Sequence, residues 1–82
     1  MHSVYILYSN TINRYYVGIT NDIDRRISEH NRKKGKFTDK GIPWNLVYKE
    51  DFVNKTEAMD RERFIKSKKS RTFIKNLIST GR

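Results

Sequence analysis

The chain has 82 residues, no cysteine and a formal net charge of +9 at neutral pH. This length predicts a single domain over residues 1–82 with a small core, because such a chain buries only roughly 60% of the surface that its unfolded form exposes. The absence of cysteine excludes disulfide bonds, a disulfide-linked partner, thiolate metal sites and thiol nucleophiles. A domain that must be stable without disulfides fits the reducing environment of the cytoplasm, where we expect this protein.

The positive charge is the first indication of a partner. A charge of this size favours binding to polyanions, above all nucleic acid, although a generic basic surface or a ribosome-associated protein would show the same excess. No segment is similar to a signal peptide or a membrane span, because the apolar run after Met1 is short and no basic leader precedes it. We therefore expect a soluble protein with no membrane partner.

Two runs rich in tyrosine and β-branched residues, 3–8 and 15–19, predict a β-hairpin. The residues between them are turn formers, which predicts a connecting loop of four or slightly more residues. Both runs are almost continuously apolar, so we expect the sheet to be covered on both faces.

The predicted pairing of the two strands places several aromatic residues together. A loop that is symmetric about residues 11–12 puts Tyr5 opposite Gly18 and Leu7 opposite Tyr16, all on one face of the sheet. Two tyrosines beside a glycine leave a gap where a backbone or a ligand can approach closely. Buried tyrosines with satisfied hydroxyl groups are common in small sheets, so each tyrosine alone is weak evidence.

Capping signals place the remaining elements. Thr20, Asn21 or Asp22 caps a first helix that runs to about Lys33, with Gly35 as its natural stop. After a polar, basic loop over residues 34–43 the pattern predicts a strand at 44–48, a helix from Asn54 to about Lys68, and a helix from Ser70 to Gly81. The predicted order is strand, strand, helix, strand, helix, helix. This is an α+β domain around a three-stranded, mainly antiparallel sheet flanked by helices.

The first predicted helix carries polar residues on and beside its apolar stripe. Ile23, Ile27 and His30 share one stripe, and Arg26 lies at its edge. An arginine there can lay its stem along the core and direct its guanidinium into a cleft. The alternative is an exposed arginine and an ordinary half-buried histidine.

The second predicted helix carries a carboxylate on its apolar face. Ala58, Glu62 and Ile65 fall within a narrow sector, which places Glu62 near the middle of the face that should pack on the sheet. Burying a lone carboxylate is unfavourable unless it is paired or bound to a metal. Glu62 could instead pair with Arg61, with Lys66 or with a cation of another element.

Combined, these patterns predict one pocket with two phenols, a guanidinium, an imidazole and a carboxylate: Tyr5, Tyr16, Arg26, His30 and Glu62. Phosphoryl chemistry needs a metal ligand, a cation for the charged phosphate and a proton acceptor for water. We expect a basic rim beside this pocket that contacts nucleic-acid backbone rather than bases: Arg25, Arg32, Lys33, Lys34, Lys36 and Lys40. For any single member of the rim the alternative is a solvated surface charge.

These positions resemble two motifs of the GIY-YIG nuclease superfamily, especially its short single-domain bacterial members and the N-terminal nuclease domain of the excision-repair nuclease. Residues 4–6, Val-Tyr-Ile, match the first motif, although Val4 replaces its leading glycine. Residues 16–18, Tyr-Val-Gly, match the second motif, with Tyr16 eleven positions after Tyr5.

The rest of the resemblance lies in the helices. Arg26 follows the second motif at the spacing of the family's catalytic arginine, and His30 comes four residues later, as in many members. Residues 58–62, Ala-Met-Asp-Arg-Glu, look like the helix that presents the metal-binding glutamate. The resemblance extends over nearly the whole chain, from Ser3 to about Ile78.

The resemblance implies a metal-dependent endonuclease that hydrolyses a phosphodiester bond of nucleic acid, DNA in particular. Glu62 would hold a single Mg²⁺ or Mn²⁺, and Arg26 would bind the phosphate and stabilise charge in the transition state. Tyr5 or Tyr16 would help to deprotonate or orient the attacking water, and His30 would orient a phenol or relay a proton.

Two positions depart from the family pattern. Ile19 stands where excision-repair relatives have a lysine, and Asn76 is only a loose candidate for the polar residue that accompanies the metal site in some members. The alternative function is a catalytically silent nucleic-acid-binding module of the same fold. Glu62 separates the two functions, because binding alone does not need a carboxylate that faces a phosphate site.

Overall fold

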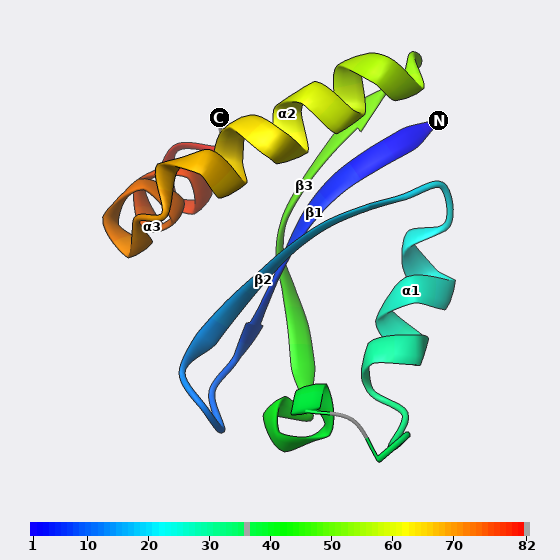
Figure 1. The fold of residues 1–82 in the computed structure, drawn as a ribbon, viewed down its shortest axis with the longest axis vertical. Coiled ribbons are helices and arrows are strands. Elements are labelled where there is room, and N and C mark those ends of the chain that lie inside the picture. Colours follow the sequence, from blue (N-terminus) through cyan, green and yellow to red (C-terminus); the bar gives the residue numbers. More distant parts are fainter. Residues whose placement is uncertain (36, 82) are drawn as a thin grey trace.

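The computed structural model describes residues 1–35 and 37–81. Three strands and three α-helices occur in the predicted order, with a short 3₁₀ helix before the third strand (Figure 1). Their bounds are β1 His2–Ser9, β2 Arg14–Thr20, α1 Ile23–His30, the 3₁₀ helix Phe37–Gly41, β3 Trp44–Phe52, α2 Lys55–Lys68 and α3 Arg71–Thr80. The prediction of an α+β fold around a three-stranded antiparallel sheet is confirmed.

The sheet has the strand order β2-β1-β3, and both pairings are antiparallel. The hairpin register is the predicted one, since Tyr5 pairs with Gly18 and Leu7 with Tyr16. Four residues join the two strands, because β1 ends at Ser9 and β2 begins at Arg14. The central position of β1 explains its continuous apolar sequence, since a strand with neighbours on both sides and helices on both faces is fully buried.

Helices cover both faces of the sheet, as expected (Figure 1). On one face Val4 and Ile6 of β1 pack with Ala58 and Ile65 of α2 and with Leu77 of α3. On the other face Tyr5 and Leu7 pack with Trp44, and the isoleucines of α1 lie against this second cluster. The alternation of side chains along β1 thus divides a small core into two layers.

The helix caps follow the sequence signals at four of the five ends for which a cap or stop residue was predicted. Asp22 caps α1 by accepting a hydrogen bond from the Arg25 amide. The Asn54 side chain accepts from two amides of the first turn of α2, and Ser70 caps α3, which ends at Gly81 with a left-handed φ of 73°. A glycine adopts that conformation without strain.

The end of α1 is the exception, because the helix stops at His30 instead of about Lys33. The Asn31 side chain accepts a hydrogen bond from the Trp44 amide at 2.6 Å and donates one to the Trp44 carbonyl at 3.0 Å. This pair of bonds ties the residue after α1 to the start of β3. A helix that continued would carry Asn31 away from these partners, so a contact distant in sequence ends the helix.

The predicted loop over residues 34–43 contains the 3₁₀ helix at Phe37–Gly41. The Asp39 carboxylate accepts hydrogen bonds from the amides of Lys34 and Gly35, which closes the segment on itself. The sequence alone predicted a loop here because five residues are too few to show helical periodicity. No helix among the described residues is long and apolar enough to cross a membrane.

Candidate active site

The site is built around Tyr5, which is fully buried at the centre of β1. Its ring lies against Gly18 on β2, so closely that a Cβ at that position would come within 2.5 Å of the hydroxyl oxygen. The gap expected beside this glycine is therefore filled by the ring of Tyr5 itself. The phenol oxygen lies 3.3 Å from His30 Nε2, a distance at which the two groups can share a hydrogen bond.

An aromatic cluster surrounds this phenol. The ring of Tyr16 is stacked with that of Tyr5 at a centroid distance of 6.3 Å, and His30 meets Tyr16 edge-on at 4.5 Å. Trp44 closes the cluster, with its ring centroid 6.3 Å from those of both Tyr16 and His30. Hairpin, α1 and β3 thus hold the imidazole between three aromatic rings.

Arg26 reaches this cluster from α1 and remains exposed, with 45% of its side-chain surface accessible to solvent. Its Nη1 lies 3.1 Å from Glu29 Oε1, one turn further along the helix. Glu29 first, and then Tyr5, raise the pKa of Arg26, and the guanidinium partly offsets the effect of burial, which raises the pKa of Tyr5. A permanently charged, accessible guanidinium therefore stands beside a buried phenol.

Glu62 approaches from α2, on the other side of the sheet. Its side chain is 20% exposed, and Oε2 lies 3.0 Å from Lys66 Nζ, one turn along the same helix. Arg61, the other nearby cation considered for Glu62, is engaged elsewhere, with Nε 3.1 Å from Glu50 Oε1. Burial is the main cause of the raised pKa of Tyr5, and the negative charge of Glu62 adds a smaller contribution in the same direction.

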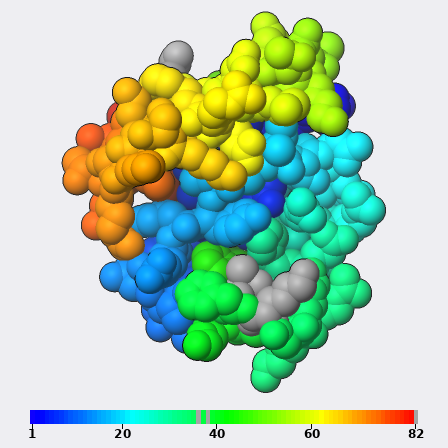
Figure 2. Space-filling model, in the orientation of Figure 1, coloured from blue at the N-terminus to red at the C-terminus, as the bar shows by residue number. Residues whose placement is uncertain are grey.

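β2 is the edge strand beside the site. Since β2 pairs only with β1 in the described sheet, its outer edge is open. Figure 2 shows β2 at the middle of one molecular face, between α2 and α1. Gly18 of this strand has no side chain to cover the phenol of Tyr5.

The phenol of Tyr5 and the imidazole of His30 are both uncharged at pH 7. Burial raises the pKa of Tyr5 above its ordinary value, and this effect outweighs the nearby Arg26, so the phenol keeps its proton at neutral pH. Burial, Arg26 and Lys34 together lower the pKa of His30. An imidazole with a lowered pKa is neutral at pH 7, so one ring nitrogen accepts hydrogen bonds and the other donates.

Glu62 is the only carboxylate of the sequence-predicted site. Among the described residues there is no group of three or more His, Cys, Asp or Glu side chains that could hold a metal ion together. Such a group is not required for Mg²⁺, which is commonly bound through one or two carboxylates with water and substrate phosphate oxygens. A single partly buried carboxylate, 20% exposed, fits that donor set.

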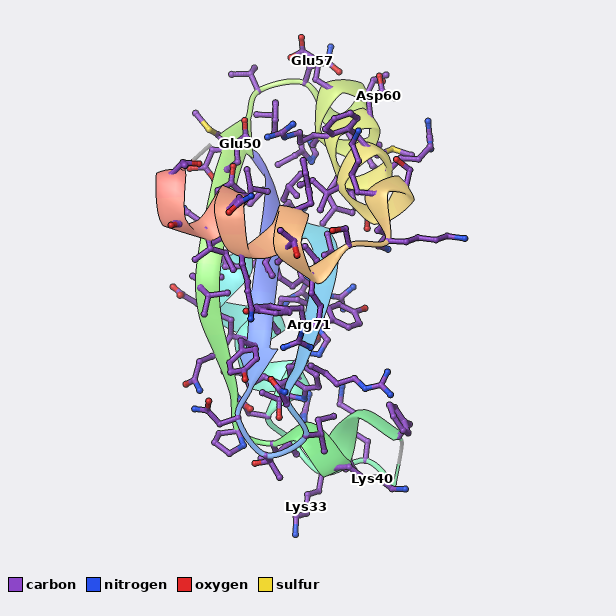
Figure 3. The ribbon with its side chains drawn as sticks, turned by 90° about the vertical axis from the view of Figure 1, so that its left-hand side faces the viewer. Lys33, Lys40, Glu50, Glu57, Asp60 and Arg71 are labelled. Atoms are coloured by element: carbon purple, nitrogen blue, oxygen red, sulfur yellow. The ribbon has the colours of Figure 1, made fainter. Side chains whose placement is uncertain are left out.

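The predicted basic rim divides between two places. Arg25 lies at the start of α1, with Nε 3.9 Å from Asp22 Oδ2. The exposed members Arg32, Lys33, Lys34 and Lys40 follow α1, and Lys36 lies outside the described residues. Figure 3 shows Lys33 and Lys40 together at one end of the molecule, whereas three carboxylates lie at the opposite end: Glu50, Glu57 and Asp60. The labelled lysines of the rim therefore lie away from these three carboxylates.

Several neighbours of the site were not singled out from the sequence. Trp44 belongs to the aromatic cluster, and Glu29 holds Arg26. The spacing of Glu29 from Arg26 on one helix could have indicated the ion pair, since residues three apart are neighbours. No local signal could have placed Trp44, because its position depends on the pairing of β3 with β1.

Comparisons with known proteins identify the family of this chain. The model of a family described as the GIY-YIG catalytic domain matches residues 1–76. A UPF0213 protein of Streptococcus pneumoniae is 45% identical over 56 residues, which are 67% of this chain and 57% of the relative. The chain thus spans just over half the length of that relative. A UPF0213 protein of Halobacterium salinarum is 43% identical over 67 residues, covering 80% of this chain and 86% of the relative.

A solved structure shows the same fold. The solution NMR structure of a UPF0213 protein from Bacillus halodurans aligns with a TM-score of 0.62 at 34% identity. The alignment covers 96% of this chain and 83% of that one.

Proposed function

Because the chain belongs to the GIY-YIG family, we propose that it is a metal-dependent endonuclease that hydrolyses a phosphodiester bond of nucleic acid, DNA in particular. The observation that carries the proposal is the grouping of an exposed guanidinium and a neutral imidazole at one buried phenol. The Tyr5 hydroxyl lies 3.3 Å from His30 Nε2, and the Arg26 side chain beside it is 45% exposed. These groups supply a cation for phosphate and a proton acceptor, and Glu62 of α2 is the carboxylate that we propose as the metal ligand.

Glu62 is the residue that would hold a single Mg²⁺ or Mn²⁺. When bound, such an ion supplies Lewis-acid stabilisation of the charge that builds up on phosphate oxygens. Arg26 binds the phosphate in this proposal, because a guanidinium makes two parallel hydrogen bonds to phosphate oxygens. To do so it must exchange its contact with Glu29, and its 45% exposure leaves room for that exchange.

The aromatic residues have separate roles in the proposal. Tyr5 keeps its proton and is fully buried, so we assign it to hold His30 and Arg26 in position. Tyr16 is only half-buried and lies edge-on to His30, which suits it to orient the attacking water. His30, neutral at pH 7, can accept a proton from that water at Nδ1 in the tautomer whose Nε2–H donates to the Tyr5 oxygen.

The test is a cleavage assay on Glu62→Ala with Asp60→Ala as the matched control. Asp60 lies on the same helix, is exposed and pairs with Arg63 at 3.3 Å. A panel of branched, flapped, nicked and single-stranded DNA and RNA is incubated with and without Mn²⁺. We expect Glu62→Ala to abolish cutting while nucleic-acid affinity stays equal or increases, because a negative charge near phosphate is removed. Cleavage that survives in Glu62→Ala would contradict the proposed role of this carboxylate.

One observation favours the alternative function, a catalytically silent nucleic-acid-binding module of the same fold. Lys66 Nζ lies 3.0 Å from Glu62 Oε2 and competes with a cation for that carboxylate. Lys66→Gln separates the two functions, because it frees Glu62 without removing it. For a nuclease we expect equal or faster cleavage at limiting Mn²⁺, whereas a silent module remains inactive.

A further inference from the structure

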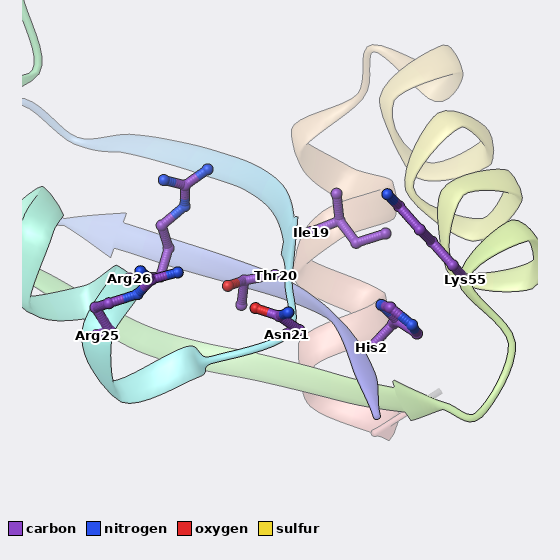
Figure 4. Close-up of a pocket in the computed structure, with 7 residues that line it drawn as sticks. All are labelled: His2, Ile19, Thr20, Asn21, Arg25, Arg26 and Lys55. Atoms are coloured by element: carbon purple, nitrogen blue, oxygen red, sulfur yellow. The ribbon is translucent and has the colours of Figure 1, made fainter.

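A cavity of about 320 Å³ lies next to the candidate site, at the end of the sheet where α1 begins (Figure 4). Lys55 reaches into it from the start of α2 toward Ile19, and Arg25 and Arg26 lie on the opposite side. Its lining residues come from four elements and the turn after β2: His2, Ile19, Thr20, Asn21, Arg25, Arg26 and Lys55. The volume is within the range of roughly 300–1,000 Å³ that small-molecule pockets occupy.

The charge of this lining is of one sign. Arg25, Arg26 and Lys55 are cationic, and no carboxylate is among the lining residues. The acidic partners of the two arginines, Asp22 and Glu29, are not among the residues that line the cavity. The contact between Arg25 and Asp22 is a long one, at 3.9 Å. Such a concave, uniformly basic surface concentrates the field and attracts an anion.

The position of Lys55 is not explained by helix stability. Lys55 is the first residue of α2, where the helix macrodipole is positive and a cation is disfavoured. The N-cap contacts of this helix are made by Asn54, so the lysine has no capping role. Its charge adds to the positive potential of the helix end, and its side chain lines the cavity.

We propose that this cavity binds a second backbone phosphate of the substrate strand, adjacent to the phosphate held by Arg26. The identity of the ligand rests on the proposed function. Arg26 lines the cavity and also belongs to the candidate active site, so the two phosphates lie on either side of one guanidinium. The substrate then needs at least one intact phosphate beyond the cleaved bond, and the direction of the strand runs from Glu62 toward Lys55.

The test measures binding in the absence of divalent metal, so that it does not depend on cleavage. The probe is a flapped DNA duplex whose junction fixes the register, in which single phosphates near the junction are replaced one at a time by neutral methylphosphonates. Affinities are compared for the unmodified protein, for Lys55→Gln and for Lys75→Gln, an exposed lysine of α3 that does not line the cavity. Both changes are at exposed positions, and circular dichroism checks that each variant folds.

At one position we expect the methylphosphonate to weaken DNA binding by the unmodified protein and by Lys75→Gln. Lys55→Gln, which already lacks the contact, should bind the modified and the unmodified DNA with equal affinity. Lys55→Gln should also reduce the slope of log affinity against log salt by roughly 0.7–0.9, the value for one phosphate contact. Equal sensitivity of all three proteins at every position would overturn the proposal, as would an absence of nucleic-acid binding.

The outcomes separate this proposal from the proposed function. The protein could cleave DNA with Mn²⁺ while no methylphosphonate effect is lost in Lys55→Gln; the nuclease proposal would then hold and the proposal of a second phosphate site would be wrong. If one methylphosphonate effect is lost in Lys55→Gln but no substrate is cleaved, the cavity binds phosphate and the nuclease proposal fails.

Discussion

The contact between Gly18 and Tyr5 makes a quantitative prediction for Gly18→Ala. The added Cβ would lie 2.5 Å from the Tyr5 hydroxyl oxygen and 2.6 Å from Cζ, where real Cβ atoms essentially never come within 3.0 Å. The phenol cannot easily retreat, because it is fully buried in the cluster with Leu7 and Trp44. Overpacking of this kind costs about 1–3 kcal/mol.

Part of this loss is offset in the unfolded state. Alanine stiffens the unfolded chain relative to glycine, which contributes about 0.4–1 kcal/mol of stability. We therefore expect Gly18→Ala to lower the free energy of unfolding by about 1–2 kcal/mol. For a domain of this size each 1 kcal/mol corresponds to roughly 4–8 °C in Tm, so the melting temperature should fall by about 4–16 °C.

The assay is urea denaturation of a double-mutant cycle with Tyr5→Leu. Replacing the ring by leucine leaves space beside residue 18, so adding Gly18→Ala to Tyr5→Leu should be neutral or stabilising. The coupling between the two changes is then about 1–2 kcal/mol, within the range for residues in contact. Additive effects, or a fully stable Gly18→Ala protein, would refute the packing of Tyr5 against Gly18 on which the site geometry depends.

Three further predictions concern the charges of the site. Arg26→Lys should cost about 2–4 kcal/mol of transition-state stabilisation, measured from single-turnover cleavage rates. Arg25→Lys, whose side chain points about 100° away around the helix, should leave the rate nearly unchanged. Equal losses would contradict the assignment of Arg26 alone to the face of α1 that meets the site. Burial, Arg26 and Lys34 lower the pKa of His30 in the folded protein. The stability that the neutral imidazole contributes is therefore fully present above the unfolded-state pKa of about 6.5 and is lost as the pH falls through the pKa of the folded state. Urea midpoints from pH 7.5 to 5 should therefore fall more steeply for the unmodified protein and for the control His2→Gln than for His30→Gln, and parallel curves would argue against this role. Neutralising Arg32, Lys33 and Lys34 of the basic rim together should reduce the slope of log duplex affinity against log salt by roughly 2–3. An unchanged slope would place the binding surface elsewhere.

The sequence by itself determined the local features of this protein. The turn-forming residues and a loop symmetric about residues 11–12 set the register that pairs Tyr5 with Gly18, because the loop length fixes which residues of a hairpin lie opposite each other. The caps at Asn54 and Ser70 are equally local, since a side chain that accepts from amides two or three residues ahead needs no other element. Helical periodicity also placed Glu62 on the inner side of α2, where it is 20% exposed.

Tertiary structure decided every feature that depends on two elements distant in sequence. Asn31 ends α1 early because its partner is Trp44 on β3, and no pattern within the helix encodes that contact. The contact of His30 with Tyr5 depends on the packing of α1 against the hairpin, because the two residues lie on separate elements. The basic cavity depends in the same way on where α2 begins relative to α1, because only the packing of both helices on one small sheet brings Lys55 opposite Arg25.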